Sequence, residues 1–400
     1  MNRHVCRRTV SAVCAALAVT LAPVLASSPA SAAEAVAPGV TYESFTVTSA
    51  HGPVVGYLVR ADLRNPQVSL DLLHPASVGA RETVSGMATA QHAVAGVNGD
   101  FFNISETHEG VPATGSSVGP EIAEGRDLKF AVPDGQRFGP AMAPGDSTRD
   151  VFGMGVDHRA RLATLELAGT AHTSRGTFAV DGLNQYALPV DGIGLYTHDW
   201  GTVSRARAAC GTDTDRSAPC SANTAEVVVR QGHVVSQSDT PGAGDIPADT
   251  EVLLGRDGGA DTLRALQPGD HVQIGTRMSA RALPSFEFAV GGFRILSGGQ
   301  PLPKLDAATL APRTGAGVSA DGRTVYLLTI DGRTAGSTGA SVAELADMLR
   351  SFGAVDAMNL DGGGSSTVAV AEGSQVAVKN APSDGAERPV ANGIGVFTRR

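Results

Sequence analysis

The 400-residue sequence predicts an α+β fold, with a strand-rich mixed sheet core and a few short helices packed on it. Hydrophobic residues make up 42% of the chain and charged residues only 18%, a balance that favours a large buried core over disorder. The 49 glycines separate many short apolar runs, which is typical of short strands joined by tight turns. Helical spacing of apolar residues occurs in only a few short segments.

The first 32 residues have the pattern of a secretory signal peptide. A start with three arginines is followed by an apolar stretch over 10–25 and by the small-residue sequence Ala30-Ser31-Ala32. The apolar stretch is short for a membrane span and contains Pro23. We therefore expect residues 1–32 to be removed, and the mature protein to be secreted to the extracellular side without a membrane span.

Charge and cysteine content limit the classes of partner. Without residues 1–32 the chain has 28 basic and 40 acidic groups, which disfavours nucleic acid as a partner. Cys210 and Cys220 are then the remaining cysteines, and in an oxidising compartment we expect them to form a disulfide. A metal site at these cysteines would need more ligands than the two thiols supply. For the protein as a whole we expect no cofactor, with a divalent cation as the alternative.

In the N-terminal part of the mature chain, strands and one helix lead to a polar motif. Residues 54–63 and 67–73 have strand patterns and flank a short turn, so we expect a hairpin. Residues 83–91 have the pattern of a short helix, and 93–97 that of a buried strand. This strand leads into Asn98-Gly99-Asp100-Phe101-Phe102-Asn103.

The C-terminal part has the clearest pattern. Residues 316–330 predict a hairpin around an Asp-Gly turn. Ser341 and Glu344 form a capping box that predicts the start of a helix, and Gly353 is the expected end of that helix. Residues 355–360 then predict a strand.

That last strand leads into the strongest candidate site, Asn359-Leu360-Asp361-Gly362-Gly363-Gly364-Ser365-Ser366. Three consecutive glycines let the backbone turn and approach a ligand, and their N–H groups can cradle an anion. Asp361 adds a carboxylate, and Ser365 and Ser366 add hydroxyl groups. The alternative is a plain Asp-Gly turn, but a turn that follows a buried strand does not need three glycines.

Two further groups of polar residues have the right chemistry for a site. Arg313, Asp331 and Arg333 bracket the predicted 316–330 hairpin, and an arginine pair can hold a phosphate through paired hydrogen bonds. The alternative for this group is a surface ion pair. The motif from Asn98 to Asn103 offers amides and a carboxylate that suit sugar hydroxyls, and its alternative is a strand end with both phenylalanines in the core.

In their order along the chain, these motifs resemble the phosphodiester glycosidase family. The resemblance is carried by Asn98-Gly99-Asp100-Phe101-Phe102, Pro312-Arg313-Thr314, Thr329-Ile330-Asp331-Gly332-Arg333, Asn359 to Ser366, and Arg388-Pro389-Val390-Ala391-Asn392-Gly393. It implies that residues 33–400 form one catalytic domain, in which the less regular segment 120–285 is an elaboration or an inserted subdomain. One departure is Asp100, which stands where the family often has glycine.

The resemblance also implies an activity, the hydrolysis of a sugar C1–O–phosphate bond. Phosphate is already a good leaving group, so the reaction needs stabilisation of negative charge more than it needs a strong acid. The implied catalytic residues are Asp361, Asp331, Arg313 and Arg333. The implied substrate-binding residues are Asn98, Asp100, Asn103, Asn359, Gly362, Gly363, Gly364, Ser365, Ser366 and Arg388.

The expected partner is therefore a carbohydrate phosphodiester, for example on cell-wall or exopolysaccharide glycans. Two other functions stay open at this point. One is a surface-polysaccharide binding protein that has the pocket without the catalysis. The other is a metal-dependent phosphodiesterase that cuts the P–O bond instead of the C–O bond.

Overall fold

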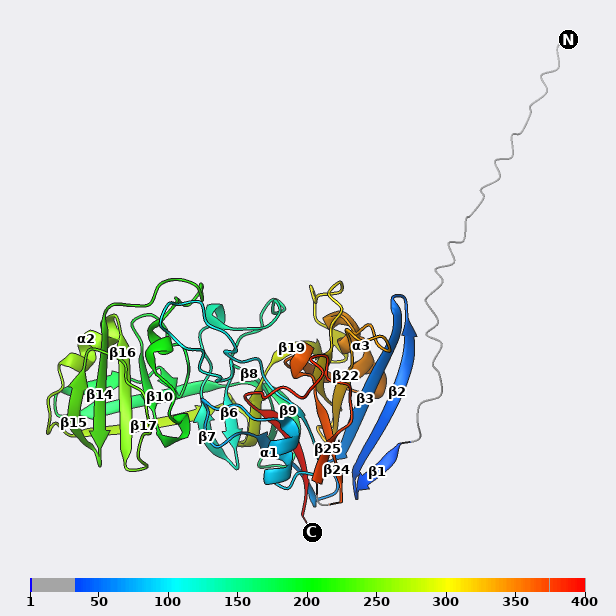
Figure 1. The fold of residues 1–400 in the computed structure, drawn as a ribbon, viewed down its shortest axis with the longest axis horizontal. Coiled ribbons are helices and arrows are strands. Elements are labelled where there is room, and N and C mark those ends of the chain that lie inside the picture. Colours follow the sequence, from blue (N-terminus) through cyan, green and yellow to red (C-terminus); the bar gives the residue numbers. More distant parts are fainter. Residues whose placement is uncertain (2–32, 374, 400) are drawn as a thin grey trace.

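The computed structural model describes residues 1, 33–373 and 375–399, so the signal peptide predicted from the sequence lies, apart from Met1, outside the described residues. The described chain forms five sheets and three short α-helices (Figure 1). This confirms the predicted α+β class with a strand-rich core. Nearly all strand pairs are antiparallel, and the parallel pair of β12 (Gly182–Leu183) and β13 (Ile193–Tyr196) makes the arrangement mixed.

The largest sheet joins the N-terminal strands of the described chain with strands from 293–359. Its eight strands, in spatial order, are β1 (Glu34–Ala37), β2 (Val40–Ser49), β3 (Gly52–Asp62), β22 (Thr324–Ile330), β21 (Arg313–Val318), β23 (Asp356–Asn359), β19 (Phe293–Ser297) and β20 (Gln300–Pro301). The hairpin predicted over 316–330 is confirmed as β21 and β22, and the strand predicted over 355–360 as β23.

A second sheet holds the strand that precedes the Asn98 motif. Its strands are β25 (Gln375–Val378), β24 (Val368–Glu372), β5 (Ala95–Asn98), β26 (Gly393–Thr398) and β4 (Val68–Leu73). The hairpin predicted over 54–73 is therefore wrong, because β3 and β4 belong to different sheets. β3 pairs with β2 and β22, β4 pairs with β26, and the turn between them carries the chain from one sheet to the other.

Three smaller sheets come mainly from residues 120–285. One contains β7 (Arg126–Lys129), β6 (Glu121–Ala123), β18 (Phe286–Gly291), β8 (Asp150–Gly155) and β9 (Ala160–Thr164). Another adds β16 (Thr250–Arg256), β14 (Thr224–Arg230) and β15 (His233–Ser238) to β12 and β13. The third contains β11 (Gly176–Ala179), β10 (Glu166–Thr173) and β17 (Val272–Ser279), and with the sheet of β14 it forms the end of the molecule farthest from β2 (Figure 1).

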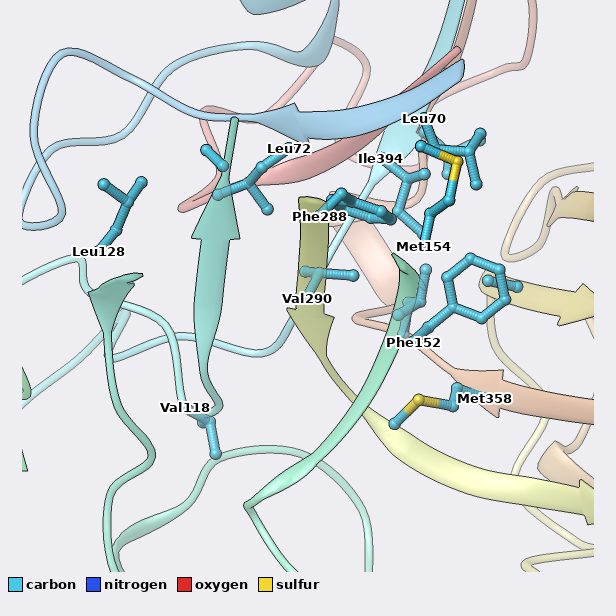
Figure 2. Close-up of a cluster of buried hydrophobic side chains, with 14 of the residues drawn as sticks. Leu70, Leu72, Val118, Leu128, Phe152, Met154, Phe288, Val290, Met358 and Ile394 are labelled. Carbon is cyan, nitrogen blue, oxygen red and sulfur yellow. The ribbon is translucent and has the colours of Figure 1, made fainter. Parts of the chain in front are cut away.

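One apolar core joins this middle segment to the two large sheets. Side chains of β8 and β18 pack against side chains of β4, β26 and β23 (Figure 2). The residues that show this are Phe152, Met154, Phe288 and Val290 on one side and Leu70, Leu72, Met358 and Ile394 on the other. β18 continues into β19, so the chain passes directly from the middle segment into the eight-stranded sheet.

The three helices are short, and α3 (Val342–Phe352) lies closest to the strands that carry the C-terminal motifs. Its predicted capping box is confirmed, with Ser341 and Glu344 bonded reciprocally, and Gly353 ends it at φ 110°. α3 can pack close to the sheet because Gly315 has no side chain. A Cβ at this position would come within 2.9 Å of Leu349. α1 (Val84–Ala90) matches the helix predicted over 83–91, and α2 (Gly258–Arg264) packs on β16. Within the described residues, no helix combines the length and the apolar character that crossing a bilayer requires.

Candidate active site

The candidate site lies where several strands of the eight-stranded sheet end or begin side by side. β21 is antiparallel to both of its neighbours, so its first residue, Arg313, pairs with the last residue of β22, Ile330. On the other side of β21, Gly315 pairs with Asn359, the last residue of β23. The loops that contain Asp331 and Asp361 therefore begin at the same edge of the sheet as Arg313.

Asn98 links the second sheet to this edge. Its Nδ2 donates to the Asp361 carbonyl oxygen at 2.7 Å, and its Oδ1 accepts from the Thr314 hydroxyl at 2.7 Å and from the Thr367 N–H at 3.0 Å. Asn98 is fully buried. The predicted contact of its side chain with a sugar is therefore not what the structure favours, because the bonds of Asn98 instead hold the backbone of Asp361.

The three consecutive glycines each lie beside a different arginine. A Cβ at Gly362 would lie 3.8 Å from Cδ of Arg313, and a Cβ at Gly363 would lie 3.3 Å from a guanidinium nitrogen of Arg333. A Cβ at Gly364 would overlap the guanidinium of Arg388 and the carboxylate of its partner, Asp384. Gly363 and Gly364 thus leave the space that the guanidinium groups of Arg333 and Arg388 occupy.

The backbone N–H groups of this run are mostly used within the chain. Gly363 N donates to the Pro312 carbonyl oxygen at 2.9 Å, and Ser365 N and Ser366 N donate to the Gly362 and Gly363 carbonyl oxygens at 3.2 Å. Gly363–Ser365 is a single 3-10 turn. The predicted backbone cradle for an anion would need these bonds to break, so the arginine side chains are the better phosphate ligands in this structure.

Asp361 is the carboxylate at the centre of this arrangement, and it is partly exposed. Burial raises the pKa of Asp361 to about 6, although the Ser365 hydroxyl, the Gly362 N–H and the charge of Arg388 all act in the opposite direction. The Gly362 N–H donates to Oδ1 at 2.9 Å. A partly exposed carboxylate that titrates near neutral pH has the properties of a general base or a nucleophile.

Asp331 is more enclosed than Asp361, with 4% of its surface exposed. The Tyr57 hydroxyl donates to its Oδ2 at 2.9 Å, and the Ala381 N–H and the Asn380 side chain donate to its Oδ1 at 3.0 and 3.3 Å. Burial raises the pKa of Asp331, and these hydrogen bonds lower it. Because both carboxylate oxygens are occupied, Asp331 is better suited to holding the loop after β25 than to attacking a substrate.

The three arginines differ in how free they are. Arg313 is almost buried and donates to the Ala340 carbonyl at 3.0 Å and to the Thr309 carbonyl at 2.7 Å. Burial lowers the pKa of Arg313, and the positive charge of Arg333 lowers it further. Arg333 is exposed, has a left-handed backbone at φ 58°, and makes no ion pair within the described chain.

Arg388 already has a carboxylate partner. It forms an ion pair with Asp384 at 2.5 Å, and its Nη1 donates to the Ser365 hydroxyl oxygen at 3.3 Å. Arg333 is therefore the most accessible cation of the three, Arg313 the most buried, and Arg388 the one that is already paired with a carboxylate.

Two of the predicted substrate-binding residues are enclosed by their own chain. Asp100 is 1% exposed and accepts from the Gly119 N–H at 2.5 Å and the Phe101 N–H at 2.8 Å. Burial raises the pKa of Asp100 to about 7, and the buried Lys129 ammonium lowers it. Asn103 is fully buried, and its Oδ1 accepts from the N–H and hydroxyl of Thr114. The hydrogen bonds of Asp100 and Asn103 therefore stabilise the motif internally, and these carboxylate and amide oxygens are not free to bind a ligand.

Asn359 and Ser366 remain candidates for contact with a polar group. Each has a buried side-chain oxygen without a hydrogen-bond partner among the described residues, and so has Thr367. Buried oxygens of this kind need water or a ligand for a partner. Sequence reasoning did not find Tyr57, Asn380 or Asp384, because these residues carry no motif and act only through the tertiary fold.

The predicted disulfide is present between Cys210 and Cys220. In the described part of the chain, one group of three potential metal ligands lies within 4.8 Å of one another, and it consists of these two sulfurs and His108. Because the sulfurs are bonded to each other, and His108 contacts Glu106 and the Ala218 carbonyl oxygen, this group does not fit a metal ion.

The phosphodiester glycosidase family model matches residues 223–397. This range contains the three arginines, Asp331 and Asp361, and it begins earlier in the chain than the C-terminal motifs, the first of which is Pro312-Arg313-Thr314. The resemblance predicted from the C-terminal motifs is therefore confirmed. The Asn98 motif lies outside the matched range.

The individual proteins that resemble this chain do so over a short stretch or at low sequence identity. Over 85 residues the chain is 39% identical to the SPbeta prophage-derived uncharacterized protein YomE of Bacillus subtilis (strain 168), and that stretch is 21% of this chain and 12% of YomE. A hypothetical protein from Synechocystis has a TM-score of 0.68 with 23% identity, and the match covers 90% of this chain and 62% of that protein. A candidate exported protein of Burkholderia pseudomallei has a TM-score of 0.65 with 26% identity, and the match covers 86% of this chain and 74% of that protein. This chain thus spans less than two thirds of the first two proteins, and the solved structures support the fold.

Proposed function

We propose that this protein is a secreted hydrolase that cleaves the C1–O bond of a sugar-1-phosphodiester, releasing a sugar and a phosphomonoester. The observation that carries the proposal is that Arg313, Arg333 and Arg388 all lie beside the three glycines that directly follow Asp361. Three arginines beside one short loop suit a phosphate group better than a neutral ligand.

The residues of the site match what this bond cleavage needs. In ordinary glycosidases a carboxylic acid protonates the leaving oxygen. A departing phosphate needs cations around its developing charge instead, and fixed donors in a partly enclosed site supply this at little cost in reorganisation. Arg333 and Arg313 would bind the phosphate oxygens, and Arg388 would exchange its bond to Asp384 for a bond to phosphate.

Asp361 would act at the sugar carbon. As a carboxylate with a pKa of about 6, it is mostly ionised at neutral pH and can either activate a water molecule or attack C1 directly. Asn98 would fix the position of Asp361 through its carbonyl oxygen, and the buried oxygens of Asn359 and Ser366 are the polar atoms left for sugar hydroxyls or for water.

The setting of the reaction is part of the proposal. The signal-peptide pattern of residues 1–32 and the Cys210–Cys220 disulfide support export, and the acidic balance of the chain supports a partner other than nucleic acid. We propose one catalytic domain over 33–400, with 120–285 as its elaboration, because the apolar core and β18 are continuous with the site-bearing sheets. Cell-wall or exopolysaccharide glycans are the proposed natural substrates.

A panel of α-linked sugar-1-phosphodiesters that differ only in the sugar tests the activity. The wild-type protein should release sugar and phosphomonoester from at least one member, and Asp361→Asn should lower that rate by about 1,000-fold. Release from no member would contradict the proposal and favour a polysaccharide-binding protein, if the same compounds still bind. An unchanged rate after treatment with EDTA is expected, and loss of the rate would favour the metal-dependent phosphodiesterase.

A further inference from the structure

Two arginines outside the site just described lie beside each other on aromatic rings. The guanidinium carbon of Arg216 is 3.9 Å from the centre of the Phe138 ring, and that of Arg137 is 5.3 Å from the centre of the Phe293 ring. Arg216 Nη1 also donates to the Arg137 carbonyl oxygen at 2.9 Å. We call these four residues, Arg137, Phe138, Arg216 and Phe293, the arginine–aromatic platform.

The disulfide loop holds the platform in place. Cys210 and Cys220 close the loop that carries Arg216. Gln136 directly precedes Arg137 in sequence, and its side chain donates to the Thr212 carbonyl oxygen of this loop at 2.5 Å. Because the chain already orders both arginines, a ligand that binds them loses less conformational entropy than it would with free side chains.

The positive charges of the platform are close together and are not neutralised by an ion pair within the described residues. Arg137 donates to the carbonyl oxygens of Gly139 and Pro140. Burial lowers the pKa of Arg137, the Asp134 carboxylate opposes this shift, and the nearby charge of Arg216 adds to it. Two like charges held beside each other are stabilised when an anion binds between them.

The platform borders the candidate active site. Phe293 pairs with Asn359 in the sheet, two residues before Asp361. The Phe293 ring also stacks on Phe101 of the Asn98 motif, with ring centres 4.8 Å apart. A ligand at Asp361 that extends across β19 would therefore meet the platform.

We infer that the arginine–aromatic platform is a second anion subsite, which binds a further phosphate group of the substrate. This inference rests on the proposed function and names its substrate class: a sugar-1-phosphodiester whose aglycone carries another phosphate, as in a glycan with repeated phosphodiester links. Guanidinium groups bind phosphate oxygens through paired hydrogen bonds, and the aromatic rings beneath keep the guanidinium planes oriented.

Two substrates with the same sugar test the subsite, namely a propyl phosphodiester and a 3-phosphopropyl phosphodiester of the best sugar in the panel. The wild-type KM should be about tenfold lower for the 3-phosphopropyl compound. Arg216→Gln should remove that preference and leave kcat and the KM of the propyl compound unchanged. Arg230→Gln removes the same charge at the exposed turn between β14 and β15, far from β19 in Figure 1, and should keep the preference.

The two ways of failing are distinguishable. If the sugar is released from both compounds but the preference is absent, or survives Arg216→Gln, the subsite is wrong and the proposed activity stands. If neither compound is hydrolysed, the activity is wrong, and calorimetric titration with inorganic tripolyphosphate then tests the subsite in an Arg333→Gln background. Adding Arg216→Gln should weaken tripolyphosphate binding about tenfold more than adding Arg230→Gln does, and equal affinities would overturn the inference.

Discussion

The Asn98 side-chain amide donates to the backbone carbonyl oxygen of Asp361 at 2.7 Å, across a sequence separation of 263 residues. Two motifs that are far apart in the chain are thus one structural unit. Because Asn98 also accepts from Thr314 and Thr367, it ties β5, β21 and the segment after the glycines to a single buried side chain.

Replacing Asn98 should therefore affect both stability and turnover. Asn98→Ala removes three hydrogen bonds and leaves the Thr314 hydroxyl and the Thr367 N–H buried without a partner, which should lower the free energy of unfolding by about 3 kcal/mol. Because Asp361 would lose its anchor, kcat should fall more than KM rises. Urea unfolding and steady-state kinetics measure both, and Asn65→Ala, in an exposed turn, is the matched control. Full activity and stability of Asn98→Ala would show that this link is unimportant.

The protonation of Asp361 should appear in the pH profile. If its carboxylate is the working form, kcat/KM should decline as the pH falls through about 6 instead of through the ordinary 3.8. An acid limb near pH 4 would show that another group controls the rate.

The raised pKa of Asp361 also makes the stability of the protein depend on pH. The folded protein binds a proton on Asp361 more tightly than the unfolded chain does, so the contribution of this group to stability decreases as the pH rises from about 4 to about 6. Asp361→Asn lacks this decrease, and its melting temperature at pH 7 should not be below that of the wild type. A clear loss of stability in Asp361→Asn at pH 7 would contradict the raised pKa of Asp361.

Gly364→Ala should disturb phosphate binding without breaking the fold. The new Cβ would overlap Arg388 and Asp384, so this ion pair must move, and KM should rise about tenfold. Gly275→Ala is the control, because nothing lies within 4 Å of its Cβ position in β17. Equal kinetics for the two variants would show that Arg388 takes no part in binding.

Arg333 and Arg313 should respond differently to substitution. Arg333 is exposed, so Arg333→Gln should lower kcat/KM about 100-fold with no change in unfolding free energy. Arg313→Ala should lower both quantities, since it also leaves the carbonyls of Ala340 and Thr309 without their donors. Chemical denaturation of both variants beside the kinetics checks this, and a stable Arg313→Ala protein would mean that those two bonds contribute little.

The parts of the site that could be predicted from the sequence are those with a local signal. The glycine run, the arginines that flank a hairpin and the Ser341 capping box are all read from a few adjacent residues. The α+β class followed in the same way from composition and short apolar runs.

The rest depends on contacts between distant segments. Nothing adjacent to Asp331 indicates that Tyr57 and Asn380 occupy its oxygens, and nothing near Asn98 shows that it faces inward to Asp361. The predicted 54–73 hairpin failed for the same reason, because β3 finds its partner in β22, more than 250 residues away.

Hydrolysis in ¹⁸O-labelled water tests the central claim most directly. With a sugar-1-phosphodiester that the protein turns over, mass spectrometry of the released phosphomonoester reports which bond was cut. Cleavage at C1–O, with the arginines stabilising a departing phosphate, predicts a phosphomonoester without ¹⁸O. A phosphomonoester that carries one ¹⁸O atom would mean attack at phosphorus, and would contradict the roles assigned to Asp361 and to the three arginines.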